Sequence, residues 1–248
     1  MMGPIYAIGD IHGYAERLEA ALAWVETDGG PDAHIVFLGD YVDRGPESRA
    51  VVERLRTGVA EGRPWTVLRG NHDRMFCRFV QGGVVHDDRI SSGHGWLNAA
   101  LGGVKTLASY GVAADEFGPM DRIWAAARAA VPADHIAFLA DRPLTYQTGT
   151  SLFVHAGIRP GVALADQEED DLVWIREPFL SHPNPFEWLI VHGHTALEHP
   201  VHYGNRVDLD GGTGYGRPLS PAVFEGDRVW ILGPKGRTAL DPITAVAQ

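Results

Sequence analysis

The chain lacks the features that mark several large classes of protein. Its 248 residues include a single cysteine, Cys77, which excludes an intramolecular disulfide and a structural zinc site built from several thiolates. We find no apolar run near the roughly 18 residues that a membrane-spanning helix needs, and no signal-peptide pattern at the amino terminus. These absences predict a cytoplasmic protein without a membrane partner.

Basic residues are also scarce. Lys and Arg together number 21 against 32 Asp and Glu, which gives a net charge of −11. Such a charge argues against a protein that binds nucleic-acid backbones. An acidic protein can still bind a phosphate group where metal ions reverse the local field. We therefore expect no nucleic-acid partner, and a phosphate-containing substrate stays open.

The length and the 45% of apolar residues suit a single α/β domain that spans residues 1–248. Short apolar runs predict strands at residues 4–8, 34–38 and 65–68. Helical spacing of apolar residues follows the first two strands, at 14–25 and from Pro46 onward. Two such units predict a parallel sheet with right-handed crossovers.

The middle of the chain predicts helices and no strands. Helical patterns occupy residues 97–110, 121–131 and 134–139, so we expect an inserted helical cap over about 82–142. Strand patterns then return at 144–148, 151–154 and 188–191, followed by apparent antiparallel strands at 206–209, 222–225 and 228–232. The second half is therefore expected to form a second sheet that packs against the first.

Three short blocks follow the first three predicted strands. They read GDIHG at residues 9–13, GDYVDRG at 39–45 and GNHD at 70–73. In an α/β sheet the carboxyl ends of the strands are where ligands bind. The glycines allow a metal ion or a phosphate to approach the backbone closely. The alternative, ordinary strand-end turns capped by aspartates, does not account for three such blocks in one chain.

The blocks supply carboxylate, imidazole and amide ligands of the kind that divalent metal ions use at hydrolytic sites. Asp10 and His12 can face one ion, Asp40 can bridge two ions, and Asn71 can supply a neutral oxygen. Two later histidines also end apolar runs and complete the predicted metal-ligand set: Asp10, His12, Asp40, Asn71, His155 and His194.

This order of motifs resembles the calcineurin-like metallophosphoesterases. The Asp43-Arg44-Gly45 ending of the second block resembles their phosphoprotein phosphatase branch, including the bacterial and phage serine/threonine phosphatases. The resemblance implies a two-sheet β-sandwich flanked by helices. It assigns Asp10, His12 and Asp40 to one ion, and Asp40, Asn71, His155 and His194 to the other.

The resemblance also implies a mechanism, in which a metal-bridging hydroxide attacks phosphorus directly. His72 would be the general acid, with Asp43 orienting its imidazole. Arg44, Asn71 and Arg176 would bind the phosphoryl oxygens. The two divalent ions would be manganese by family habit, although iron, zinc and nickel suit the same ligands. His192, two residues before a predicted ligand, is expected to pack rather than bind metal.

The sequence leaves the substrate open. The main prediction is a phosphomonoesterase of the serine/threonine protein phosphatase kind. The alternative is a symmetrical dinucleoside tetraphosphate hydrolase, because Asp73 and the His155-Ala156-Gly157 segment are familiar from those enzymes. A catalytically inactive binding module is a third hypothesis, which would have lost a ligand or His72. The natural partner, the oligomeric state and any regulators are not indicated.

Overall fold

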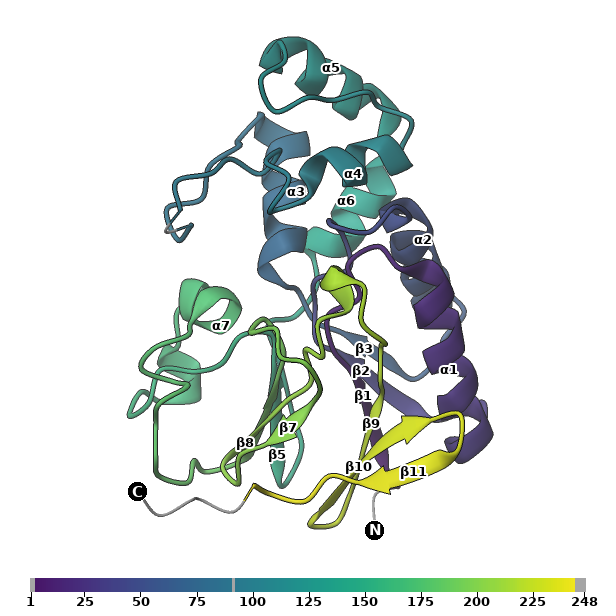
Figure 1. Ribbon diagram of the computed structural model, residues 1–248, viewed down its shortest axis with the longest axis vertical. Coiled ribbons are helices and arrows are strands. Elements are labelled where there is room, and N and C mark those ends of the chain that lie inside the picture. The colour runs from purple at the N-terminus through teal and green to yellow at the C-terminus, as the bar shows by residue number, and fades with distance from the viewer. Residues whose placement is uncertain (1–2, 91, 244–248) are drawn as a thin grey trace.

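The first sheet is built on the strands that precede the three blocks. The computed structural model describes residues 3–90 and 92–243, with two sheets and helices on their outer faces (Figure 1). The strand order of this sheet is β11 (Gly236–Ala239), β10 (Arg228–Gly233), β9 (Ala222–Glu225), β1 (Ile5–Ile8), β2 (His34–Phe37), β3 (Trp65–Val67). The last three strands are parallel, which confirms the predicted strand–helix–strand units.

The second sheet is mixed as well. Its strand order is β4 (Thr145–Gln147), β5 (Ser151–Val154), β6 (Leu189–His192), β8 (Arg206–Asp208), β7 (Val201–His202). The three inner strands are parallel, and the two edge strands are antiparallel to their neighbours. Two mixed sheets flanked by helices confirm the predicted fold class.

One part of the predicted sheet arrangement is wrong. The strand at 206–209, expected to be antiparallel alongside 222–225 and 228–232, runs parallel to β6. The hairpin of β9 and β10 joins the first sheet, where β9 pairs with β1. A turn such as Gly226-Asp227 specifies a hairpin but not its neighbour. The neighbour is decided by Ala222 and Phe224, which pack in the core between the sheets.

Two helices cover the outer face of the first sheet. α1 (Ala15–Gly29) buries Leu18, Ala21, Leu22 and Val25, a stripe at helical spacing. It continues four residues beyond the predicted end at residue 25, and the chain leaves it through Gly30 with a φ of 81°. α2 (Ser48–Ala60) packs beside α1.

A layer of helices stands at one end of the sheets, between β3 and β4 in the chain (Figure 1). It consists of α3 (Asn71–Gly82), α4 (Gly103–Ser109), α5 (Met120–Ala130) and α6 (Ala133–Ala140). The predicted helix at 97–110 is too long, because residues 97–102 form turns that end at Gly102, whose φ is 97°. No strand occurs among the described residues of 82–142. The division of the chain into domains stays a prediction.

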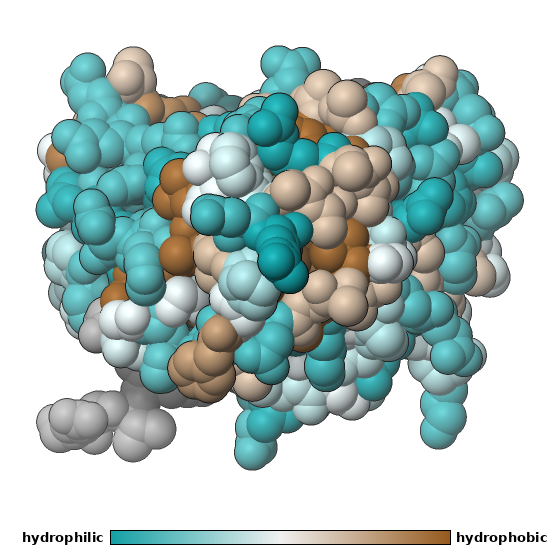
Figure 2. All heavy atoms as spheres, turned by 90° about the horizontal axis from the view of Figure 1, so that it is seen from above, coloured by the Kyte–Doolittle hydropathy of each residue, from teal (hydrophilic) through white to brown (hydrophobic). Residues whose placement is uncertain are grey.

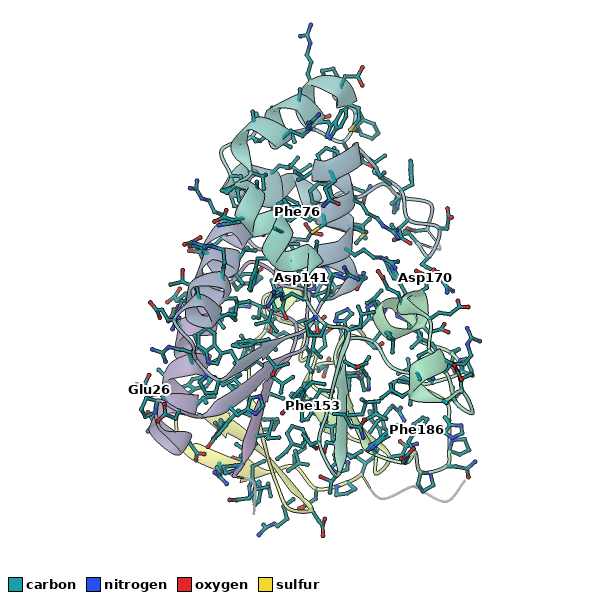
Figure 3. All side chains as sticks on the ribbon, turned by 180° about the vertical axis from the view of Figure 1, so that it is seen from behind. Glu26, Phe76, Asp141, Phe153, Asp170 and Phe186 are labelled. Atoms are coloured by element: carbon teal, nitrogen blue, oxygen red, sulfur yellow. The ribbon has the colours of Figure 1, made fainter. Side chains whose placement is uncertain are left out.

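The sequence patterns miss α3, although its first turn is the third block. Phe76 and Phe79 on α3 pack against Trp96, with ring centroids 5.7 and 4.9 Å apart. Figure 3 shows Phe76 inside the helical layer, whereas Phe153 lies between the sheets. This helix therefore joins the site to the core of the helical layer.

Three apolar cores hold the layers together. One lies between α1, α2, the helical layer and the first sheet, and a second lies between the two sheets. The third lies between the second sheet and the segment that carries the short helix α7 (Glu169–Trp174), with Phe186 at its edge (Figure 3). Two 3-10 turns, η1 (Leu164–Asp166) and η2 (Thr213–Tyr215), complete the described elements.

The α5 end of the molecule is mainly hydrophilic, with apolar side chains gathered near the middle of that face (Figure 2). Phe117, which precedes α5, is 89% exposed. In the part of the chain that the structure describes, each helix is too short or too polar to cross a bilayer.

Candidate active site

The site lies where the loops after the parallel strands of both sheets meet, and its backbone is strained. Positive φ angles occur at five described residues other than glycine: His12, Asp40, Asp43, Arg44 and His194. All five are predicted site residues. Each such conformation costs free energy, which surrounding contacts must offset.

Asp73 supplies several of those contacts. It lies in the first turn of α3, and its carboxylate accepts hydrogen bonds from the backbone N–H groups of Asp40 (2.8 Å), Tyr41 (2.9 Å) and Gly70 (2.9 Å). The third block is thereby fastened to the second. A return bond from the N3 side chain to the N-cap backbone is also what stabilises the start of a helix.

Asp10, His12 and Asp40 form the first group of predicted ligands. The Nε2 atom of His12 lies 3.6 Å from an Asp40 oxygen and 3.9 Å from an Asp10 oxygen. The Nδ1 atom of His12 donates to the carbonyl of Val42 at 2.9 Å. This hydrogen bond fixes the tautomer, so the lone pair of Nε2 faces the carboxylates.

Asp40, Asn71, His155 and His194 form the second group. The Nδ1 atom of His155 donates to the carbonyl of Leu38, and its Nε2 lies 2.8 Å from Asn71 Oδ1 and 3.5 Å from an Asp40 oxygen. Asn71 Oδ1 also lies 3.0 Å from His194 Nδ1, and the buried Nε2 of His194 has no hydrogen-bond partner among the described residues. Asp40 therefore belongs to both groups, as the bridging prediction requires.

The donor set of the two groups fits divalent cations. Lone pairs of imidazole nitrogens point at carboxylate and amide oxygens, so acceptors face acceptors across the site. Ligand atoms of Asp40, His155 and His194 lie within 4.8 Å of one another, as do those of His12, Asp40 and His72. Oxygen and imidazole ligands in this arrangement suit several divalent metals and do not select one.

Burial shifts the pKa values of the predicted metal ligands toward their uncharged forms. Burial raises the pKa of Asp10 well above its usual range, and the nearby Asp210 and Asp40 carboxylates add to the effect. Burial likewise raises the pKa of Asp40, with Asp73 as the next cause. Burial lowers the pKa of His12 and takes that of His155 to about 3, so both imidazoles are neutral at pH 7.

His72 and Asp43 form a buried pair beside the two groups. The Nδ1 atom of His72 donates to Asp43 at 2.6 Å. The same carboxylate accepts hydrogen bonds from Thr106 Oγ1 (2.6 Å) and Trp96 Nε1 (2.8 Å). Burial raises the pKa of Asp43 to about 7, while these donors lower it. Burial and the charge of Arg44 lower the pKa of His72 well below its ordinary value.

Two arginines face the same space. The guanidinium of Arg44 contacts the Nε2 atoms of His12 and, at 3.2 Å, His72. Arg176 lines a cavity of about 150 Å³ whose other walls include Asp40, Arg44, Asn71, His72 and His194. The structure thus brings together all ten predicted site residues. Their roles stay predictions.

Comparison with known proteins identifies the family. The family model described as "Calcineurin-like phosphoesterase" matches residues 3–217 of this chain. The chain is a calcineurin-like phosphoesterase. Two divalent metal ions held by oxygen and imidazole ligands can support phosphoester hydrolysis.

Curated relatives of this phosphoesterase are named bis(5'-nucleosyl)-tetraphosphatases, most of them symmetrical and the one from Oceanobacillus iheyensis asymmetrical. A protein from Bordetella parapertussis, named a symmetrical bis(5'-nucleosyl)-tetraphosphatase, is 32% identical over 64% of this chain and 45% of its own length. One of the same name from Methylococcus capsulatus is 29% identical over 83% of this chain and 57% of its own. The chain thus spans about half the length of the curated relatives it matches.

Solved structures share the fold of the phosphoesterase at lower identity. One provisionally named a diadenosine tetraphosphatase superposes with a TM-score of 0.62, at 22% identity, over 92% of this chain and 91% of the other. A cold-active protein-tyrosine phosphatase from a Shewanella species superposes with a TM-score of 0.64, at 17% identity, over 97% and 81%.

Sequence reasoning misses several residues at the phosphoesterase site. Trp96 and Thr106, which hold Asp43, come from the helical layer, where no motif marks them. Asp208 and Asp210 lie beside Asp10 at the end of β8, and both are buried. An Asp-x-Asp pair after a strand-like run was visible in the sequence, but its partner is more than 190 residues away.

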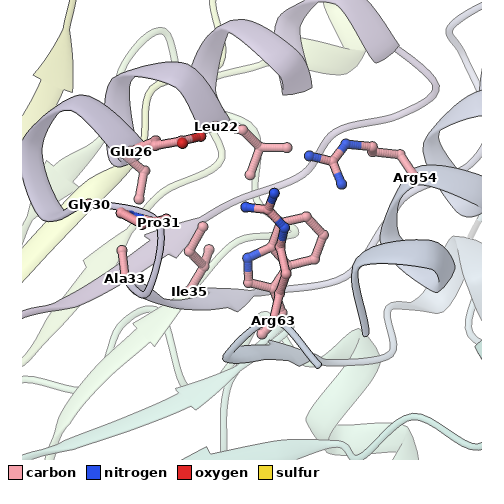
Figure 4. A pocket seen from close by; sticks show the side chains of 10 residues that line it. Leu22, Glu26, Gly30, Pro31, Ala33, Ile35, Arg54 and Arg63 are labelled. Atoms are coloured by element: carbon pink, nitrogen blue, oxygen red, sulfur yellow. The ribbon is translucent and has the colours of Figure 1, made fainter. Parts of the chain in front are cut away.

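Other hollows lie apart from this chemistry. One is a small pocket of about 20 Å³ between α1, β2 and β3, and the guanidiniums of Arg54 and Arg63 both lie near the Trp65 ring. Figure 4 shows Arg54 and Arg63 at this pocket. None of the ten predicted site residues lines it. His192 is buried and stacks edge-on to Phe179, in keeping with the packing role expected for it.

Proposed function

We propose that this phosphoesterase hydrolyses dinucleoside tetraphosphates symmetrically. The observation that carries the proposal is the name symmetrical bis(5'-nucleosyl)-tetraphosphatase, which the Bordetella protein bears at 32% identity and the Methylococcus protein at 29%. The convergent carboxylates, imidazoles and arginines support the chemistry, and the relatives support the substrate. Water adds to one inner phosphorus, and the bond from this phosphorus to the central oxygen, which joins the two inner phosphorus atoms, breaks. The central oxygen leaves with a proton, and the products are two nucleoside diphosphates.

The metal ligands in this proposal are the two groups that share Asp40. Asp10 and His12 would hold one ion, and Asn71, His155 and His194 would hold the other. When bound, two divalent ions polarise a phosphoryl oxygen and lower the pKa of water. The buried carboxylates Asp10 and Asp40 supply the negative charge that such ions require, although burial opposes their ionisation.

His72 is proposed to protonate the leaving oxygen. Its Nδ1 proton is held by Asp43 at 2.6 Å, so its Nε2 atom is the one that would act toward substrate. In the structure Arg44 donates to that Nε2 atom at 3.2 Å. A bound phosphoryl group would attract Arg44 and favour a proton on His72 by its negative charge.

Arg44 and Arg176 are proposed to bind the polyphosphate. Both guanidiniums line the cavity beside Asp40 and Asn71. Arginine side chains match the geometry of phosphate oxygens and stay charged at all physiological pH values. A substrate with four phosphates carries enough negative charge to use both arginines and the metal ions.

The serine/threonine protein phosphatase prediction has weaker support. The motif ending Asp43-Arg44-Gly45 favours it, but the relatives from Bordetella and Methylococcus are named tetraphosphatases. The likeness to a protein-tyrosine phosphatase at 17% identity concerns the fold alone. We therefore keep protein dephosphorylation as the outcome that would replace our proposal.

A product assay separates the two functions. Protein loaded with Mn²⁺ is offered diadenosine tetraphosphate, a phosphoserine peptide and a phosphotyrosine peptide, and products are separated by ion-exchange chromatography. We expect ADP as the sole nucleotide product and a kcat/KM far above that for either peptide. Asp40→Asn should abolish ADP release, which shows that the activity belongs to this site. Phosphate release from a peptide without ADP formation would overturn the proposal, and equal amounts of AMP and ATP would exclude symmetrical cleavage.

A further inference from the structure

Tyr215 is an exposed aromatic side chain at the edge of the site, and the chemistry above gives it no role. Its side chain lies in η2 and is 63% exposed. The guanidinium carbon of Arg44 lies 5.0 Å from the centre of its ring. One part of the ring therefore faces a proposed phosphate-binding residue, and the rest is open to solvent.

The loop that carries Tyr215 is firmly held. Arg17 on α1 donates to three of its backbone carbonyls, those of Thr213 (3.1 Å), Gly216 (2.9 Å) and Arg217 (2.7 Å). Contacts that fix a loop before a ligand arrives lower the entropy cost of binding. An aromatic side chain held in this way is prepared to bind a flat partner.

The same loop also touches the centre of the site. A Cβ atom placed on Gly214 would lie 2.6 Å from a ring carbon of His12 and 2.9 Å from Arg44 Cδ. Only glycine allows this approach, because any side chain would displace a predicted metal ligand. The position of Tyr215 is thus fixed relative to the metal ligands and to Arg44.

Arg44 joins two regions of the site. It lines the cavity that also contains Trp174 and Arg176, whereas Tyr215 lies outside the lining of that cavity. A symmetrical dinucleotide carries a nucleoside at each end of its phosphates. Cleavage in the middle leaves a nucleoside diphosphate on each side of the centre, so the protein needs room for a base in two directions.

We propose that the exposed face of Tyr215 is a binding subsite for a nucleobase, which stacks on the ring while the attached phosphates lie against Arg44. The proposal rests on the proposed function, because it takes its ligand class from a dinucleotide substrate. Stacking of a base on an aromatic side chain contributes a factor of about 5 to 150 in affinity. An additional effect on catalysis is not required for the subsite to act.

Calorimetric binding of two products tests the subsite without measuring activity. ADP and inorganic pyrophosphate carry the same number of phosphates, and only ADP has a base. In Mn²⁺-loaded protein we expect ADP to bind more tightly than pyrophosphate. Tyr215→Ala should weaken ADP binding about tenfold and leave pyrophosphate binding unchanged, whereas Tyr215→Phe should keep both affinities. Phe117→Ala, which removes another exposed aromatic ring, is the matched control and should change neither.

Three results would overturn the subsite. The first is equal affinity of the native protein for ADP and pyrophosphate, and the second is unchanged ADP binding in Tyr215→Ala. The third is equal weakening of ADP and pyrophosphate binding in Tyr215→Ala, because Tyr215 would then act only by holding Arg44. If Tyr215→Ala does not fold, Tyr215→Leu provides the same comparison. If ADP binding depends on Tyr215 but the protein does not cleave diadenosine tetraphosphate, the proposed function is refuted and the subsite is supported. If the protein cleaves diadenosine tetraphosphate but Tyr215→Ala leaves ADP binding unchanged, the proposed function is supported and the subsite is refuted.

Discussion

At the residue scale, the site depends on a few side chains that hold an unfavourable backbone in place. His12, Asp40 and His194 have φ angles of 50°, 56° and 66°, and each is a predicted metal ligand. The three backbone hydrogen bonds to Asp73 and the three donors around Asp43 fix the loops that carry them. Strain at a functional site persists only where neighbouring contacts determine the conformation in this way.

The general-acid role of His72 predicts a dependence on the leaving group. His72→Asn should lower kcat/KM about 100-fold or more for an alkyl phosphate such as a phosphoserine peptide, and far less for an aryl phosphate, because a phenolate leaves without a proton. Steady-state kinetics on the two substrates measure the difference. His86→Asn, at an exposed position, is the control. Equal losses on both substrates would remove the acid role from His72.

Asp73 predicts a loss of stability without a change of ligands. Asp73→Asn replaces an acceptor oxygen by an N–H group that faces backbone donors, so the free energy of unfolding should fall by about 2–4 kcal/mol. Urea denaturation measures this. Asp88→Asn, at an exposed position of the same charge, should change stability by less than about 0.5 kcal/mol. An unchanged free energy of unfolding in Asp73→Asn would contradict the positioning role of Asp73.

At the element scale, α3 and α7 are joined by charged side chains beside the cavity. Arg74 on α3 is 4% exposed and contacts Asp87 at 3.0 Å and Asp170 at 2.6 Å. Figure 3 shows Asp170 on α7, facing the helical layer. α7 ends at Trp174, and the cavity-lining Arg176 follows two residues later. The ion pairs therefore place one of the two proposed phosphate-binding arginines.

Removal of Arg74 predicts a change in both stability and KM. Arg74→Leu leaves the buried Asp87 without its buried partner, so we expect a loss of about 3 kcal/mol in the free energy of unfolding. Displacement of α7 should raise the KM for a phosphate-rich substrate more than it lowers kcat. Arg78→Leu is the matched control, because Arg78 also contacts Asp87 at 3.0 Å but its side chain is 45% exposed. Equal changes in the free energy of unfolding and in KM for the two variants would contradict the role proposed for Arg74.

At the scale of the whole molecule, the site exists only because two sheets end at the same place. Asp10, Asp40 and Asn71 follow strands of the first sheet, whereas His155 and His194 follow strands of the second. The apolar core between the sheets holds these ends together. Metal ions would therefore link the two sheets and bind the folded protein far better than the unfolded chain.

Removal of metal predicts a loss of both activity and stability. Treatment with a chelator should abolish phosphoester hydrolysis and lower Tm, because buried Asp10 and Asp40 then lack a counter-charge. Mn²⁺ at about 100 times its dissociation constant should restore about 2.7 kcal/mol of stability. Differential scanning calorimetry with and without Mn²⁺ measures this. Asp40→Asn should show little stabilisation by the metal, and an equal response in that variant would contradict the predicted ligand set.

Much of the site and of the first sheet can be predicted from the sequence, because the relevant signals are local. The three blocks place Asp10 near His12 and Asp43 near Arg44 within a few residues, and each block follows a strand whose apolar pattern is clear. Spacing of apolar residues likewise predicts α1 and α2. These features depend on neighbours along the chain, so no tertiary contact is needed to recognise them.

The way in which distant segments meet becomes visible only in the folded protein. It placed β9 beside β1, put Trp96 and Thr106 against Asp43, and brought Asp210 to Asp10. It also set the Tyr215 ring over Arg44. Such contacts join residues 50 to 220 positions apart, and they arise from the burial of apolar faces between layers. A local pattern records that a face is apolar but does not record which other face will cover it.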